Sequence, residues 1–144
     1  MNHTYPITCS PGSVEFRMFC AHDERGGTLA AGIDVSDQFE YEWRRWLKHR
    51  AVRIEQGDDL RVERQVDHTL YFRRRWHAFR ALKIIRQTRT VRLLRTNGRP
   101  RWILETSCLE DLEDDSVRHS LQLMLAIAQY CHGTYEGFGA PVVS

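Results

Sequence analysis

Three pairs of side chains in this chain have the residue types that acid–base or nucleophilic catalysis requires. Asp67-His68 are neighbours on an expected strand, so their side chains point to opposite faces and cannot pass a proton to each other. Ser116 and His119 are one helical turn apart, but the serine is better explained as a helix cap. Cys131-His132 lie at the end of an expected helix, where the cysteine belongs to the buried side. None of these pairs forms a nucleophile–base–acid set, so we expect no catalytic residue and no enzyme.

The cysteines and histidines do not follow a metal-binding pattern. The nearest approaches are Cys20-Ala21-His22 and Cys131-His132, whereas a structural zinc site takes two closely spaced pairs of ligands. The sequence also lacks a phosphate-binding glycine loop and a His-Glu metal motif. We therefore expect no metal, no cofactor and no small-molecule substrate. The four cysteines are expected to stay reduced, because no other feature indicates export.

Arginine is the residue type whose distribution indicates a binding function. The chain has 19 arginines and 2 lysines, with a net charge of only +2. Residues 61–101 carry 13 basic and 2 acidic side chains, a net +11, between flanking segments of net −3 and −6. Because the guanidinium is a planar fork, this bias favours bidentate recognition of carboxylate or phosphate.

The first predicted partner-binding cluster is Arg73, Arg74 and Arg75. These three cations open an expected helix, where they oppose the positive end of the helix dipole at a cost of about 0.3–1 kcal/mol each. One interpretation is a site for phosphate or an acidic partner. The interpretation favoured by the expected topology is internal. It places the acidic residues of 110–115 at the same end of the sheet, where a salt-bridge network would neutralise the cluster.

The second predicted cluster is Arg92, Arg95 and Arg99, on and beside an expected hairpin. Charges on an edge strand discourage pairing between sheets, which is the structural interpretation. The functional interpretation is contact with an acidic protein or an RNA backbone, since clustered arginines steer encounters with polyanions. The run lacks interleaved aromatic residues for base stacking. A protein partner is therefore favoured over RNA.

The elements that must position these residues follow from the apolar periodicity. The second helix has a buried stripe of Val117, Leu121, Met124, Ala128 and Cys131, with Gly133 as a left-handed terminator. The expected order is strand 68–72, helix 73–86, strands 90–96 and 101–107 around a type I′ turn at Asn97-Gly98, helix from 114 or 115 to 132, and strand 134–143.

This order predicts an α+β protein with a ferredoxin-like split β-α-β (βαββαβ) sandwich. In that layout we expect the first and third strands to be central and parallel, so that both helices begin at the same end of the sheet. The final strand is expected at a sheet edge, because Pro141 cannot donate to a ladder.

Residues 1–56 are expected to form an N-terminal strand and helix extension, separate from the domain at 57–144. A strand is expected at 14–20, a turn at 25–27 and a helix at 37–50. Its shared aromatic side is expected to pack on the domain, over the open face of the sheet, and comprises Phe39, Trp43, Trp46 and Leu47. The longest apolar run, 123–128, falls well short of the ~20 residues that cross a bilayer, and the start lacks an export signal. We expect a soluble cytoplasmic protein without a membrane partner.

Two segments at the ends of the predicted domain carry a resemblance to a known family. The first is Gly57-Asp58-Asp59-Leu60, followed by Glu63-Arg64, Val66-Asp67-His68 and Leu70-Tyr71-Phe72. The second is Tyr135-Glu136-Gly137-Phe138-Gly139. Together, over about residues 56–143, they resemble ribonuclease E inhibitor domains of the RraB (regulator of ribonuclease activity B) family. The second segment is similar to that family's closing Tyr-Asp-Gly-Trp motif, with conservative changes at its second and fourth positions.

The resemblance implies a ferredoxin-like domain that binds an endoribonuclease and lowers its activity, without a cofactor or chemistry of its own. It implies a mainly structural role for the motif residues, which hold the last strand against the first: Asp67, His68, Tyr71, Phe72, Tyr135, Glu136, Gly137 and Phe138. We predict a non-catalytic regulatory protein that binds a ribonuclease or a related protein partner and modulates RNA degradation. The alternatives are an RNA-binding accessory domain that uses the arginine-rich hairpin, and a structural or toxin-neutralising partner unrelated to RNA.

Overall fold

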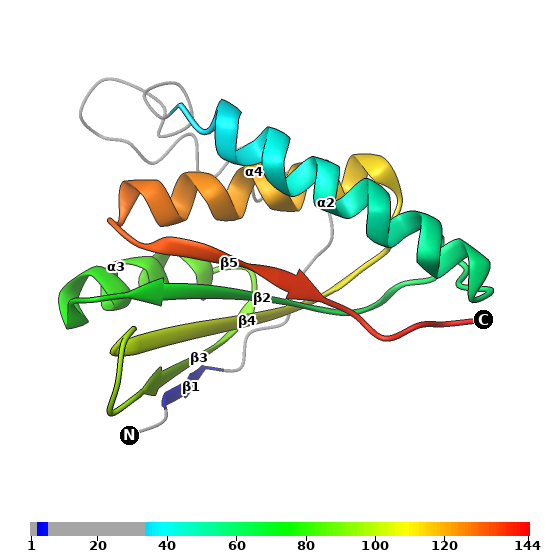
Figure 1. The fold of residues 1–144 in the computed structure, drawn as a ribbon. Helices are drawn as coiled ribbons and strands as arrows, with labels where there is room; N and C mark the ends of the chain where they lie inside the picture. The colour runs from blue at the N-terminus through cyan, green and yellow to red at the C-terminus, as the bar shows by residue number, and fades with distance from the viewer. Residues whose placement is uncertain (1–2, 6–33) are drawn as a thin grey trace.

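The computed structural model describes residues 3–5 and 34–144, and its α+β class is the predicted one (Figure 1). The strand expected at 14–20 and the turn at 25–27 lie outside these residues. The described elements are β1 (His3–Tyr5), α2 (Ser36–Glu55), β2 (Arg64–Phe72), α3 (Arg75–Ile85), β3 (Thr90–Arg95), β4 (Trp102–Glu110), α4 (Asp114–Tyr130) and β5 (Thr134–Gly139).

The strands form one antiparallel sheet in the order β1-β3-β4-β2-β5, with β5 at an edge as predicted. The central strands β2 and β4 are antiparallel, so the expectation of parallel central strands was wrong. The crossover through α3 makes β2 and β3 run the same way, and the β3–β4 hairpin then reverses the chain. Phe72 therefore pairs with Trp102 and Arg64 with Glu110. As a consequence, α3 and α4 begin at opposite ends of the sheet.

The hairpin between β3 and β4 has a longer loop than the predicted two-residue turn. The last ladder pair is Arg95 with Trp102, and the Thr96 N–H donates to the Arg101 carbonyl at 2.8 Å. Gly98 does not have the positive φ that a type I′ turn requires. Cross-strand pairing explains the difference, because the observed register sets Arg92 opposite Glu105, where the two form an ion pair.

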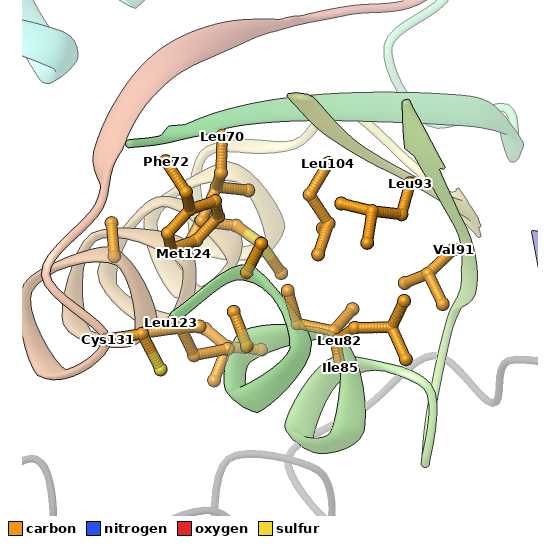
Figure 2. Close-up of a cluster of buried hydrophobic side chains, with 14 of the residues drawn as sticks. Leu70, Phe72, Leu82, Ile85, Val91, Leu93, Leu104, Leu123, Met124 and Cys131 are labelled. Atoms are coloured by element: carbon orange, nitrogen blue, oxygen red, sulfur yellow. The ribbon is translucent and has the colours of Figure 1, made fainter. Parts of the chain in front are cut away.

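The core lies between one face of the sheet and helices α3 and α4 (Figure 2). The side chains of β2 alternate, with Leu70 and Phe72 in this core and Thr69 and Tyr71 on the opposite face. All five positions predicted for the buried stripe of α4 are buried. On α3 the buried residues are Ala78, Ala81, Leu82 and Ile85. Trp76, which the spacing placed with them, is 62% exposed.

Helix α4 ends in a left-handed residue one position earlier than predicted. His132, not Gly133, has the positive φ, 56°. The Gly133 N–H donates to the Ala128 carbonyl at 2.7 Å and the His132 N–H to that of Gln129 at 3.3 Å, which is a Schellman arrangement. Gly133 is required for space, because a Cβ there would lie 2.3 Å from Cε1 of Phe72.

Helix α2 packs through its aromatic side, as expected, and extends beyond the predicted end at residue 50. Trp46 is buried against α4 and β5, and its Nε1–H donates to Asp114 Oδ1 at 3.4 Å. Phe39 and Trp43 stack beside this cluster, with ring centroids 5.9 Å apart, whereas Leu47 is partly exposed. The helix lies beside α4 on the helix-covered side of the sheet rather than over its open face (Figure 1).

The two cysteines in the described part of the chain are in different states. Cys131 is a free, buried thiol, in agreement with the expectation of reduced cysteines. Cys108, on β4, is disulfide-bonded, which contradicts that expectation. The sequence argument relied on the absence of export signals and gave no information on which side chains meet in the fold.

Candidate partner-binding site

A basic surface of the described residues lies where β2 ends, α3 begins and the β3–β4 hairpin turns. We call it the basic–aromatic corner. It surrounds a hollow of about 440 Å³ and comprises Arg73, Arg74, Arg75, Trp76, Phe79, Arg95, Arg101 and Trp102. The antiparallel register brings these residues together, because the end of β2 lies beside the start of β4. Residues about twenty positions apart in the sequence thus share one surface.

The arginines of the corner have no acidic counterpart among the described residues. The expected salt-bridge network is not formed, because the acidic loop before α4 lies at the other end of the sheet. Its Glu110 instead pairs with Arg89 at 2.5 Å, and its Asp114 pairs with Arg50. Helix α3 has no acidic residue in its first turn. The corner arginines therefore combine with the positive end of the α3 dipole.

Three aromatic rings hold the corner guanidiniums in place. The Arg74 guanidinium lies 5.3 Å from the Trp76 ring centroid, that of Arg75 lies 5.1 Å from Phe79, and that of Arg95 lies 5.9 Å from Trp102. Cation–π contacts of this kind contribute about 0.5–1 kcal/mol at exposed sites. A guanidinium that lies over a ring in this way keeps its N–H groups available for hydrogen bonds to another group.

A β-bulge in β5 explains the Tyr135–Phe138 segment. Thr69 pairs with Gly137 and Leu70 with Tyr135, so Glu136 is the extra residue. This insertion lets residues three positions apart face the same side, whereas a regular strand would put them on opposite faces. Gly137 has a φ of +150°, which side-chain-bearing residues rarely adopt. The bulge therefore places both aromatic rings on the helix-covered side.

His68 is the buried centre on which these two rings close. Its Nδ1 lies 2.8 Å from the Tyr135 hydroxyl, and its ring centroid lies 5.4 Å from that of Phe138. Burial, together with the charge of Arg89, lowers the pKa of His68 well below its usual value. Asp67 points to the opposite face, as predicted, where its Oδ1 accepts hydrogen bonds from Ser107 at 2.5 Å and Gln65 at 3.0 Å. The segment is thus a structural closure.

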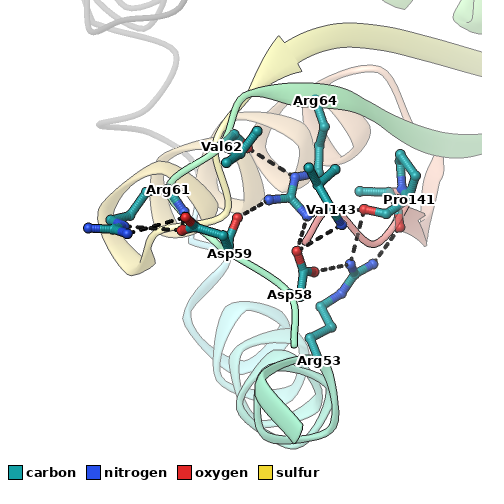
Figure 3. A network of polar contacts seen from close by, with 9 residues as sticks. Arg53, Asp58, Asp59, Arg61, Val62, Arg64, Pro141 and Val143 are labelled. Carbon is teal, nitrogen blue, oxygen red and sulfur yellow. Dashed lines mark hydrogen bonds and ion pairs between the residues drawn. The ribbon is translucent and has the colours of Figure 1, made fainter. Parts of the chain in front are cut away.

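Asp58 is the centre of a buried polar network (Figure 3). Its carboxylate pairs with Arg64 of β2 and, at 2.9 Å, with Arg53 of α2, and it accepts the Val143 N–H at 3.1 Å. Arg64 also donates to the Pro141 carbonyl at 3.1 Å. Burial alone would raise the pKa of Asp58, but hydrogen bonds from Arg64, the Val143 amide and Arg53 lower it below its usual value. The network ties α2, β2 and the C-terminal tail together.

Asp58 and His68, the residues at these two structural centres, lie within a segment that matches a known family. The family model of RraB, regulator of ribonuclease activity B, matches residues 53–140. The chain belongs to the RraB family. No curated protein matches it. The RraB match covers Arg53, Asp58 and Arg64 of the carboxylate network, the His68 closure and every residue of the basic–aromatic corner, and it ends before Pro141 and Val143. The family is described as a regulator of ribonuclease activity.

The six arginines that we predicted as partner-binding residues of this RraB protein divide into three groups. Arg73, Arg74, Arg75 and Arg95 belong to the corner. Arg99 lies next to it, in the hairpin loop that faces His132 and Thr134. Arg92 is on the open face of the sheet, paired with Glu105.

Four corner residues, Trp76, Phe79, Arg101 and Trp102, were not among the predicted set. The position of Trp76 directly after three exposed arginines was the available signal, because a buried tryptophan rarely opens a helix beside three charges.

The RraB chain shows no alternative site of another chemical kind within residues 3–5 and 34–144. No group of three or more His, Cys, Asp or Glu side chains in this part could hold a metal ion. None of its helices combines the length and apolar character that a bilayer span requires. A second hollow, of about 780 Å³, is lined by side chains of α2, of β5 and of the open face of the other strands, but its charged lining is mixed: Glu42, Arg45, His49, Arg53, Asp67, Arg92, Glu105 and Glu136.

Proposed function

We propose that this RraB family member regulates RNA degradation by binding a ribonuclease, or a protein bound to one, through the basic–aromatic corner, without catalysing a reaction itself. The family supports the regulation of ribonuclease activity. The observation that carries the binding site is the set of five exposed corner arginines, which form no ion pair with any described carboxylate. An uncompensated cationic surface is maintained at a cost in self-repulsion, which an acidic partner would offset.

The fold supports a surface-acting module. We interpret the segment from β2 to β5 as a ferredoxin-like split β-α-β sandwich, and the strand order β3-β4-β2-β5 supports this interpretation. We propose 57–144 as the regulatory domain and 1–56 as an extension whose helix α2 covers it. A regulator of RNA decay would act in the cytoplasm, where we place it.

A second candidate function is an RNA-binding accessory domain. The observation in its favour is that the fold supplies the aromatic residues that the arginine run lacks, since Trp76 and Trp102 stand among the corner arginines. Base stacking on aromatic rings and phosphate contacts from arginine are the usual combination in single-strand binding.

The proposed function is tested by reconstitution. The tagged chain is used to purify its partners from the native host, with and without ribonuclease A treatment, and the recovered endoribonuclease is then assayed on a labelled RNA. We expect the nuclease to remain bound after the treatment and its cleavage rate to change when the chain is added. An unchanged cleavage rate at saturating protein would refute regulation, and loss of the nuclease after RNA digestion would support the RNA-binding alternative.

A further inference from the structure

We infer that the basic–aromatic corner binds an acidic peptide segment of the partner, in which carboxylates flank an apolar or aromatic anchor side chain. This inference rests on the proposed function and specifies the partner's chemistry. Three properties of the corner lead to it: the orientation of the guanidiniums, the apolar lining of the hollow, and the limited extent of the positive surface.

The guanidiniums are oriented for carboxylates. Arg74, Arg75 and Arg95 each lie over a ring at 5.1–5.9 Å, so rotation of the planar group is restricted before a ligand arrives. A restricted fork presents two parallel N–H groups, the geometry that a carboxylate accepts in a bidentate manner. Less side-chain entropy is then lost on binding than with free arginines.

The hollow provides a place for an anchor residue. Its floor includes Trp76, Phe79 and Trp102, and its volume of about 440 Å³ can hold one large side chain. Trp76 is 62% exposed, whereas Trp43 and Trp46, the tryptophans outside the corner, are partly and fully buried. Tryptophan and arginine are among the residue types that most often dominate the energy of protein interfaces.

RNA fits this surface less well than a peptide does. Each of the three rings has a guanidinium over one face, so a base stacked on that face would displace an arginine–ring contact, whereas an anchor side chain can enter the hollow that the rings line. The positive surface is also short. The acidic loop before α4 lies at the other end of the sheet, so an extended strand that ran along the sheet from the corner would meet like charge there. A peptide of a few residues would stay within the arginines.

The test uses three fluorescein-labelled probes and the full chain. The first probe is the peptide Asp-Glu-Asp-Phe-Glu-Asp-Glu, the second replaces its Phe by Gly, and the third is an oligouridylate of similar length. Fluorescence anisotropy in 50 mM and 200 mM salt gives each affinity. We expect the Phe peptide to bind more tightly than the Gly peptide by several-fold, and more tightly than the oligouridylate. Equal binding of the two peptides would overturn the anchor, and preference for the oligouridylate would overturn the peptide.

Charge-matched variants separate the corner from general electrostatics. Arg74→Glu with Arg95→Glu removes two oriented forks, and Arg44→Glu with Lys48→Glu makes the same change of charge on exposed positions of α2. We expect at least about a tenfold loss of peptide affinity for the corner variant and less than about twofold for the control. Equal losses would show non-specific attraction and refute the inference. If the corner variant still alters RNA cleavage by the nuclease, the inference fails while the proposed regulation stands.

Discussion

Replacing Asp58 by Asn tests whether the buried network stabilises the fold. The Asp58 side chain is fully buried and that of Arg64 is 2% exposed. The substitution leaves the Arg64 guanidinium without its counter-ion, and breaking a buried pair in this way costs about 3–5 kcal/mol. The residual contacts of Arg64 with the carbonyls of Asp59, Val62 and Pro141 reduce that penalty. We therefore expect a loss near the lower limit, about 3 kcal/mol.

Urea unfolding followed by tryptophan fluorescence measures this loss, with the neighbouring residue as the control. Asp59→Asn removes an ion pair whose arginine, Arg61, is 78% exposed, and should cost far less stability because solvent screens an exposed pair. The same substitution type at adjacent positions should thus differ severalfold in effect. Equal, small losses at both positions would show that the Asp58 network contributes no more than a surface pair, and would refute the reasoning.

The pH dependence of the Asp58→Asn effect follows from the direction of the pKa shift. The folded pKa of Asp58 is below the usual value of 3.8, so the unfolded chain takes up the proton first as pH falls. The stabilisation is then complete above about pH 5 and is lost as pH falls through the folded pKa. The difference between wild type and variant should shrink in acid. A difference that grows below pH 4 would contradict the sign.

Three further predictions concern the closure of the sheet and the end of α4. Gly133→Ala places a Cβ 2.3 Å from the Phe72 ring and should destabilise the protein by about 1–3 kcal/mol in urea unfolding, whereas Gly98→Ala, with open space around it, should change little. Gly137→Ala meets no atom within 4 Å but requires a φ of +150°, so about 1–3 kcal/mol is expected from backbone strain alone. An unchanged free energy of unfolding for Gly137→Ala would show that the bulge does not hold this residue at a positive φ. Burial raises the pKa of Cys131 to about 12, so peptide mass spectrometry should find this thiol unmodified by iodoacetamide at pH 8 and modified in urea.

Local patterns predicted most of the elements, because burial and periodicity are coupled within each helix and strand. The stripe of α4, from Val117 to Cys131, follows directly from the 3.6-residue repeat. The hairpin loop did not follow from its Asn97-Gly98 dipeptide, since the register is decided by partners on the other strand, such as Glu105 opposite Arg92. Strand direction likewise depends on the whole order of connections, which no single segment encodes.

The sequence allowed the residue types of the candidate site to be predicted, but not which of these residues would meet on one surface. The arginines at 73–75 and 95 stand out in the sequence, whereas their meeting at one corner depends on the antiparallel register of β2 and β4. Arg92 illustrates the limit, because a strand alternates and two arginines three positions apart face different sides. The role of Asp58 was also hidden, since its partners Arg53 and Val143 lie on opposite sides of it in the sequence.

The packing of α2 sets how short a functional piece of this protein can be. The family match begins at residue 53, near the end of α2, yet Trp46 is buried in a cluster with Val66, Leu121 and Phe138. A fragment cut at the start of the match would bare that apolar patch and leave Asp114 without Arg50. Exposed patches of this kind promote self-association. Expression trials should therefore start upstream of Ser36, where the whole helix is retained.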